Sequence, residues 1–169
     1  MRVYRIEREK YLDTTLKGLG AALTEGCRWN GLNTRLVYTS ESRALATLEI
    51  SVHLDFSEDL PTDRYYVEID IPDGIKILEL RTEDLPKHWD IKPPSLETQY
   101  IGDDFANDNK AAVLKVPSSI VPPEYNYLIN PGHPEAEKIT VVSTERLVLT
   151  KDLNRIMPKI QGFRFKVQG

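Results

Sequence analysis

Short segments with strand character set the strongest limit on how this chain can fold. Residues 65–71 alternate regularly between apolar and polar side chains, as a strand with one buried face does. Many strands of this length, combined with only two or three helices, predict a single mixed α+β domain with small central β-sheets and flanking helices. The other segments predicted as strands are residues 3–6, 36–39, 111–116, 125–129 and 139–142.

A turn sequence follows the most regular of these segments. Pro72, Asp73 and Gly74 are typical turn residues, and residues 75–80 beyond them again have strand character. The sequence therefore predicts a hairpin that pairs residues 65–71 with residues 75–80. The order of the remaining strands does not follow from such local patterns.

Residues 95–109 have the spacing of a helix. The apolar residues Leu96, Tyr100 and Phe105 are predicted to point inward from it. Residues 12–31 carry four glycines and are predicted to be irregular.

Residues 40–56 fit two periodicities. As a strand, Leu48 and its alternate neighbours would face inward; as a helix, Leu45, Leu48, Val52 and Phe56 would form one stripe. We favour a helix, at least for the first half, because Ser40 is a good N-cap and the run Ala-Leu-Ala at residues 44–46 favours helix.

The helical interpretation has a consequence for Glu49. It places this carboxylate on the apolar stripe, where a charged group is costly unless it has a partner. A structural ion pair and a functional carboxylate both account for such a position.

Composition excludes several classes of protein. The 169 residues are 40% hydrophobic and 28% charged, which predicts one folded domain over residues 1–169. A net charge of −4 disfavours nucleic-acid binding, and the locally basic stretch 151–169 is interpreted as a solvated face. The single cysteine, Cys27, a charged N-terminus and the lack of a long apolar run predict a cytoplasmic protein without a membrane segment.

No common catalytic motif stands out. His53, His88 and His133 lack the spacing of metal ligands, so no metal site is predicted, and no phosphate-binding glycine loop is present. No histidine lies near Cys27 in the sequence, which makes it a poor candidate nucleophile.

Two blocks of sequence carry a family resemblance. The first comprises residues 26–30 (GCRWN), 36–40 (LVYTS) and 44–49 (ALATLE), followed by His53. The second comprises residues 114–119 (LKVPSS) and 126–134 (NYLINPGHP). In this order they resemble the RES domain, a family named for an arginine, a glutamate and a serine, and the resemblance extends over most of the chain.

The resemblance implies an ADP-ribosyltransferase-like fold and an activity on NAD. It implies a toxin of a toxin–antitoxin pair that cleaves the nicotinamide–ribose bond, with NAD as substrate and no cofactor. Water, phosphate as a co-substrate, or a protein side chain can then accept the ADP-ribose, so a glycohydrolase, a phosphorylase and an ADP-ribosyltransferase stay open. A non-catalytic interaction protein of the same fold is the alternative. The implied partner is an antitoxin with an Xre-type helix-turn-helix domain, in an oligomeric toxin–antitoxin complex.

The resemblance also assigns site residues. The naming residues correspond to Arg28, Glu49 and Ser118, and Tyr38 corresponds to a tyrosine that lines the family's pocket. Taken without the family, these side chains have ordinary explanations: a surface ion pair for Arg28, a core position for Tyr38 and a helix cap for Ser118. The chain departs from the family at Cys27, where a glycine is common, and at residues 17–20 (KGLG), where Ser-Gly-Glu-Gly is common.

These residue types suit the implied chemistry. Cleavage at the ribose carbon passes through a transition state like an oxocarbenium ion, which an oriented carboxylate such as Glu49 stabilises. Arg28 can bind a diphosphate through two parallel hydrogen bonds. Tyr38 can stack on nicotinamide, and Ser118 can bond the carboxamide or a phosphate.

Overall fold

Seven strands form one mixed sheet in the computed structural model, which describes residues 1–52 and 62–148. The strand order is β4-β5-β6-β2-β1-β3-β7, and only β4 and β5 run parallel. The predicted α+β class is therefore confirmed, with a single sheet in the described ranges. The strands are β1 Arg2–Arg8, β2 Val37–Ser40, β3 Arg64–Asp70, β4 Ile77–Glu79, β5 Val113–Pro117, β6 Tyr125–Ile129 and β7 Thr140–Arg146.

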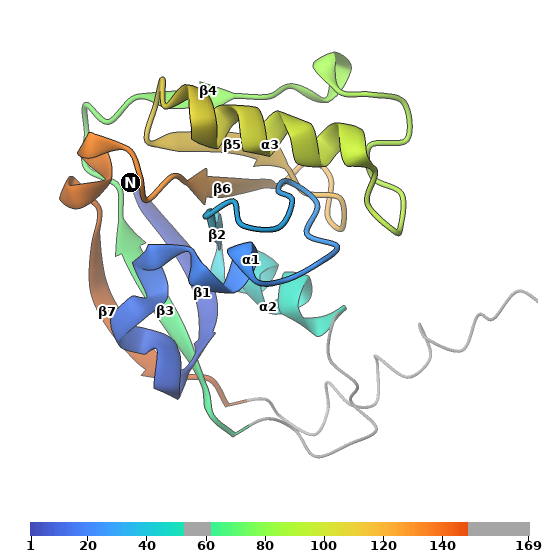
Figure 1. The fold of residues 1–169 in the computed structure, drawn as a ribbon. Coiled ribbons are helices and arrows are strands. Elements are labelled where there is room, and N and C mark those ends of the chain that lie inside the picture. The colour runs from blue at the N-terminus through green and yellow to red at the C-terminus, as the bar shows by residue number, and fades with distance from the viewer. Residues whose placement is uncertain (53–61, 149–169) are drawn as a thin grey trace, which may run out of the picture.

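The helices are few and short. Figure 1 shows α3 alongside β4 and β5. Within the described residues, no helix is long and apolar enough to cross a membrane. The α-helices are α1 Leu19–Ala22, α2 Arg43–Ser51 and α3 Leu96–Asp108, and the 3₁₀ helices are η1 Glu9–Lys17, η2 Thr82–Asp84 and η3 Pro134–Lys138.

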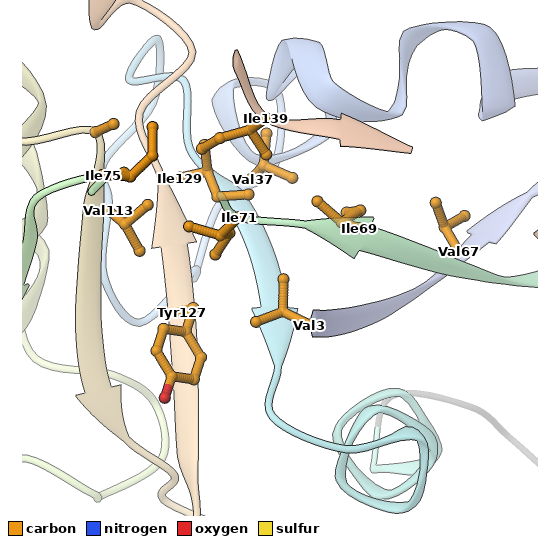
Figure 2. Packing of buried hydrophobic residues seen from close by; sticks show 11 residues of the cluster. Val3, Val37, Val67, Ile69, Ile71, Ile75, Val113, Tyr127, Ile129 and Ile139 are labelled. Atoms are coloured by element: carbon orange, nitrogen blue, oxygen red, sulfur yellow. The ribbon is translucent and has the colours of Figure 1, made fainter. Parts of the chain in front are cut away.

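The central strands bury both of their faces. Alternate residues of a strand point to opposite sides, so Val37 and Ile129 enter one core while Leu128 enters another. In the first core, apolar side chains from β1, β2, β3, β5 and β6 gather as Figure 2 shows. The second core contains Trp29 and Phe105, packed under α3 and the loop before β2. Each fully buried valine, leucine, isoleucine or phenylalanine side chain contributes about 1.5–3 kcal/mol to the stability of the fold.

The predicted hairpin after β3 is wrong. β4 pairs with β5, at the opposite edge of the sheet from β3. Both edges of β3 are already occupied, by β1 and by β7, so no edge is left for the segment that follows the turn. Gly74 lies in a left-handed conformation, with φ 88°, and the chain crosses from there to the far edge.

The helical interpretation of residues 40–56 is confirmed for α2, but its details change. The N-cap is Ser42, whose side chain accepts a hydrogen bond from the Leu45 amide, while Ser40 belongs to β2. Leu45 is buried, whereas Leu48 and Val52 are each 38% exposed, so the predicted stripe is wrong beyond its first residue. Further along the helix, contact with the sheet is polar, and the Thr47 hydroxyl hydrogen-bonds the Tyr66 hydroxyl of β3 at 2.7 Å. Phe56 lies outside the described residues.

The inward face of α3 also differs from the prediction. Phe105 is buried as expected, but Leu96 is 63% and Tyr100 60% exposed. Thr98 and Gly102 are buried instead and share one face with Phe105. Small residues on this face let the helix approach a neighbouring loop, which an apolar count along the sequence does not reveal.

Most of the remaining strand predictions are confirmed, but the irregular segment predicted at residues 12–31 is not. Residues 12–31 are not wholly irregular, because η1 and α1 occupy part of them. The strands predicted at residues 3–6, 36–39, 65–71, 111–116 and 139–142 are confirmed with shifted ends, and residues 125–129 coincide with β6. Residues 151–169, predicted to be a solvated basic face, lie outside the described residues.

Candidate active site

The register of three strands brings polar side chains to one face of the sheet. Ser40, at the end of β2, lies opposite Asn126 at the start of β6. Asn126 alternates with Tyr127 and therefore points to the same side as Leu128, toward the second core. Ser118 follows the last residue of β5 and lies beside these two. A polar cluster thus forms where β2 and β5 end and β6 begins.

Glu49 reaches this cluster from α2. Its Oε1 accepts a hydrogen bond from the Ser118 hydroxyl at 2.9 Å and a second from the Asn126 amide at 2.6 Å. These are the partners that a carboxylate beside an apolar face needs, and both are neutral. The described contacts therefore replace the structural ion pair that the sequence left open.

The hydroxyl of Ser118 has little freedom. The residue is 1% exposed, and its Oγ accepts hydrogen bonds from the amides of Ile120 and Val121, each at 3.1 Å. These two hydrogen bonds use both lone pairs of the Ser118 Oγ, so its single hydroxyl proton is directed at Glu49. Ser118 does cap the turn after β5, but it also orients the carboxylate.

Arg28 lies on the loop between α1 and β2. Its guanidinium donates to the carbonyl oxygens of Trp89, of Asp90 at 3.2 Å and of Ile91 at 3.2 Å. It also lies 5.9 Å from the centre of the Trp89 ring. Burial lowers the pKa of Arg28, while the charges of Asp90 and Glu49 raise it. The carbonyl groups of residues 89–91 therefore hold the guanidinium in place.

Tyr38 holds the loop that carries Arg28. Its hydroxyl donates to Asn30 Oδ1 at 2.6 Å and accepts from the Trp29 amide at 3.1 Å. Burial raises the pKa of Tyr38 well above its ordinary value, so the phenol keeps its proton. Asn30 in turn donates to three backbone carbonyls, including those of Ala21 and Thr34. The tyrosine ring contacts the second core, and its hydroxyl fixes the loop.

Helix α3 clamps the same loop from the other side. A Cβ added at Gly102 would lie 1.5 Å from the Trp29 carbonyl oxygen, so no larger residue fits without movement. Gln99 donates to the Cys27 carbonyl at 2.8 Å, and Asp103 accepts from the Gly31 amide at 3.0 Å. The position of Arg28 therefore depends on a helix about seventy residues further along the chain.

Sequence reasoning missed several of these residues. Asn126 opens the second segment of the second block, and Asn30 closes the first segment of the first block, but neither was assigned a role. Gln99 and Gly102 carry no local signal, because their contacts are with a distant loop. A polar residue at a strand position that faces a core was the available clue for Asn126.

Other candidate groups do not add to the cluster. Burial raises the pKa of the Cys27 thiol, which disfavours the nucleophilic thiolate. In the described ranges, no three His, Cys, Asp or Glu side chains gather as a metal site would require. Cavities of about 260 Å³ and 400 Å³ lie elsewhere, beside Asn130 and against Phe105, and neither is lined by Arg28, Tyr38, Glu49 or Ser118.

The chain matches a known family of proteins over nearly all of the residues that the structure describes. The RES domain family model matches residues 2–150, and this chain belongs to that family. The family predicted from the two sequence blocks is thereby confirmed.

The chain is also similar to curated members of the family that are named as toxins. The chain is 46% identical over 126 residues to the Prs ADP-ribosylating toxin of Sphingobium sp. (strain YBL2), covering 73% of this chain and 77% of that toxin. It is 39% identical over 132 residues to the Toxin Res of Photorhabdus laumondii, covering 78% of this chain and 82% of that toxin. The Toxin Res of Yersinia enterocolitica is 37% identical over 133 residues, which cover 79% of this chain and 86% of that toxin.

A solved structure shares the fold. A chain in the crystal structure of the M. tuberculosis MbcT–MbcA toxin–antitoxin complex matches with a TM-score of 0.71. The match covers 94% of this chain and 88% of that chain, at 15% sequence identity. Similarity at this level concerns the fold.

Proposed function

We propose that this protein is the toxin of a toxin–antitoxin pair and that it cleaves the nicotinamide–ribose bond of NAD. Membership of the RES family and relatives named as toxins support the first part. The observation that carries the second is the Glu49 carboxylate, held in one orientation by Ser118 and Asn126.

A fixed carboxylate suits this reaction. Nicotinamide leaves as a neutral molecule, while positive charge develops on the ribose. Glu49 stabilises that charge, directly or through a ribose hydroxyl, and needs little reorganisation because two donors already orient it.

Arg28 is the proposed site for the diphosphate. A guanidinium binds phosphate oxygens with charge and with defined geometry. In the structure the Nη1 and Nη2 atoms donate to residues 89–91, so bound phosphate must use the remaining N–H groups or displace these carbonyls. Tyr38 contributes by holding the loop in place, and its ring face is the proposed contact for nicotinamide.

The acceptor of the ADP-ribose distinguishes two versions of this proposal. Water or phosphate would make the protein an NAD glycohydrolase or phosphorylase. A protein side chain would make it an ADP-ribosyltransferase, which the name of the Sphingobium relative favours.

One experiment tests the reaction and its acceptor. The purified protein is incubated with NAD in the presence and absence of phosphate, and again with a bacterial lysate, and all products are identified by mass. We expect nicotinamide release in every case, and the partner of the ADP-ribose then identifies the acceptor. NAD that stays intact under all three conditions contradicts the proposal.

We further propose an antitoxin partner with an Xre-type helix-turn-helix domain, in an oligomeric complex. One chain of the MbcT–MbcA toxin–antitoxin complex shares the fold of this protein, and this similarity supports a partner of the antitoxin class. A carboxylate of the antitoxin can occupy the diphosphate position at Arg28. Co-expression should yield a complex with suppressed NAD turnover, and excess NAD should compete with the inhibiting segment. A tight complex that cleaves NAD at the rate of the free protein contradicts inhibition at this site.

A further inference from the structure

We propose that Asn126, oriented by Ser40, is a positioning residue that aims the carboxylate of Glu49 at the substrate. This inference rests on the proposed function for its chemistry, but the geometry that supports it is independent of the substrate.

The orientation of the Asn126 amide is determined by its neighbours. The Ser40 hydroxyl donates to Asn126 Oδ1 at 2.7 Å, and Asn126 Nδ2 donates to Glu49 Oε1 at 2.6 Å. Turning the amide over would place its oxygen against a carboxylate oxygen, so that two acceptors would face each other. Only one orientation therefore satisfies both neighbours.

Both donors to Glu49 act on the same oxygen. Ser118 and Asn126 each donate to Oε1, so the two hydrogen bonds fix the rotation of the carboxylate as well as its place. Oε2, which no described side chain contacts by a hydrogen bond, is the oxygen that faces the ribose in the proposed reaction.

Asn126 lies on β6, Ser118 directly follows the paired strand β5, and both side chains are themselves fixed. Asn126 lies opposite Val116 of β5, two residues before Ser118. Ser118 is held by two backbone amides, and Asn126 by Ser40, which is only 4% exposed. Removing Asn126 would leave Glu49 with one donor and an open rotation about its last bond.

A purely structural role for Asn126 makes a different prediction. Its link to Ser40 also ties β2 to β6, but the adjacent Thr39 makes a similar tie on the opposite face, donating to the Tyr127 carbonyl at 2.8 Å. Thr39→Val is therefore a matched control, since it removes one buried hydrogen bond from the same strand pair without touching Glu49.

The first test uses Asn126→Asp. A protonated aspartic acid can donate to Glu49 as the amide does, whereas an ionised one repels it. We expect turnover close to wild type at acidic pH and a fall of roughly 10-fold or more as pH rises, with KM nearly unchanged. Arg28 and the other ionisable groups of the chain are common to wild type and variant, so a difference between the two pH profiles belongs to position 126. A pH profile parallel to that of wild type would overturn the proposal.

The second test does not depend on activity. In a crystal structure of Asn126→Leu, we expect the Glu49 carboxylate to rotate or to occupy several conformations, while Thr39→Val leaves it in place. A Glu49 that stays fixed by Ser118 alone would overturn the positioning role. If the wild-type protein does not cleave NAD, the proposed function fails, and this structural comparison still decides the role of Asn126.

Discussion

The two faces of the central sheet use the same strands to hold their side chains in different ways. Toward the first core, β2 and β6 present Val37, Tyr127 and Ile129, and shape and apolar burial dominate (Figure 2). Toward the other face they present Ser40 and Asn126, which join a chain of hydrogen bonds that ends on Glu49.

Neighbouring residues therefore serve opposite purposes. A shift of one residue in the pairing of β2 with β6 would exchange the two faces, sending the polar groups into the apolar core. The apolar face thus fixes the register that the polar face needs. The difference predicts that substitutions of the apolar residues on the first face affect folding, whereas substitutions in the hydrogen-bonded chain that ends on Glu49 affect the reaction.

The largest effect on folding is expected from Ile69→Ala. Ile69 is fully buried in the first core, so the change should lower the free energy of unfolding by about 2–5 kcal/mol. Denaturant titration measures this loss, and initial rates on NAD measure the folded fraction. A raised KM in fully folded protein would show that the two faces are not separate.

Glu49→Gln should have the largest effect on the reaction. The amide keeps an oxygen for Ser118 and Asn126 but removes the charge, so turnover should fall at least roughly 10²-fold, about 2.7 kcal/mol. The denaturant midpoint should hardly change. Near-normal turnover of the folded variant would remove Glu49 from the mechanism.

Gly102→Ala tests the clamp between α3 and the Arg28 loop. The new methyl group would meet the Trp29 carbonyl, so we expect a loss of about 1–3 kcal/mol in stability together with weaker NAD binding. Gly20→Ala is the matched control, because it adds a methyl group in α1 with no atom within 4 Å. Equal behaviour of the two variants would argue against the clamp.

Arg28→Lys should weaken NAD binding roughly 10-fold, about 1.4 kcal/mol, with a smaller effect on folding. Lysine keeps the charge but cannot reproduce the planar contacts with phosphate or with residues 89–91. Calorimetric titration with NAD measures the change, and Arg35→Lys, at an exposed position before β2, serves as control. Unchanged affinity would rule out the phosphate role.

Tyr38→Phe should have the smallest effect. It removes both hydrogen bonds of the phenol, at a cost of about 1 kcal/mol. The pKa of Tyr38 is raised in the folded protein, so its contribution is fully present below the unfolded value of about 10 and is lost as pH rises beyond it. Stability curves should therefore fall less steeply above pH 10 in the variant. Parallel curves would contradict this account of Tyr38.

The sequence by itself determined the class of fold and the family. Local alternation was enough to find β3 to within one residue, at residues 65–71, because a strand with two different faces carries its own period. The order of the two blocks was enough to identify the RES domain and to select Arg28, Tyr38, Glu49 and Ser118 as candidates.

The tertiary structure decided the order of the strands and the side-chain contacts of each candidate residue. It placed β4 beside β5 rather than β3, turned Gly102 inward in place of Tyr100, and joined Asn126 to Glu49 across 77 positions of sequence. Such pairings depend on which strand edges are free and on how closely backbones approach. These are properties of distant segments packed together, which no local pattern contains.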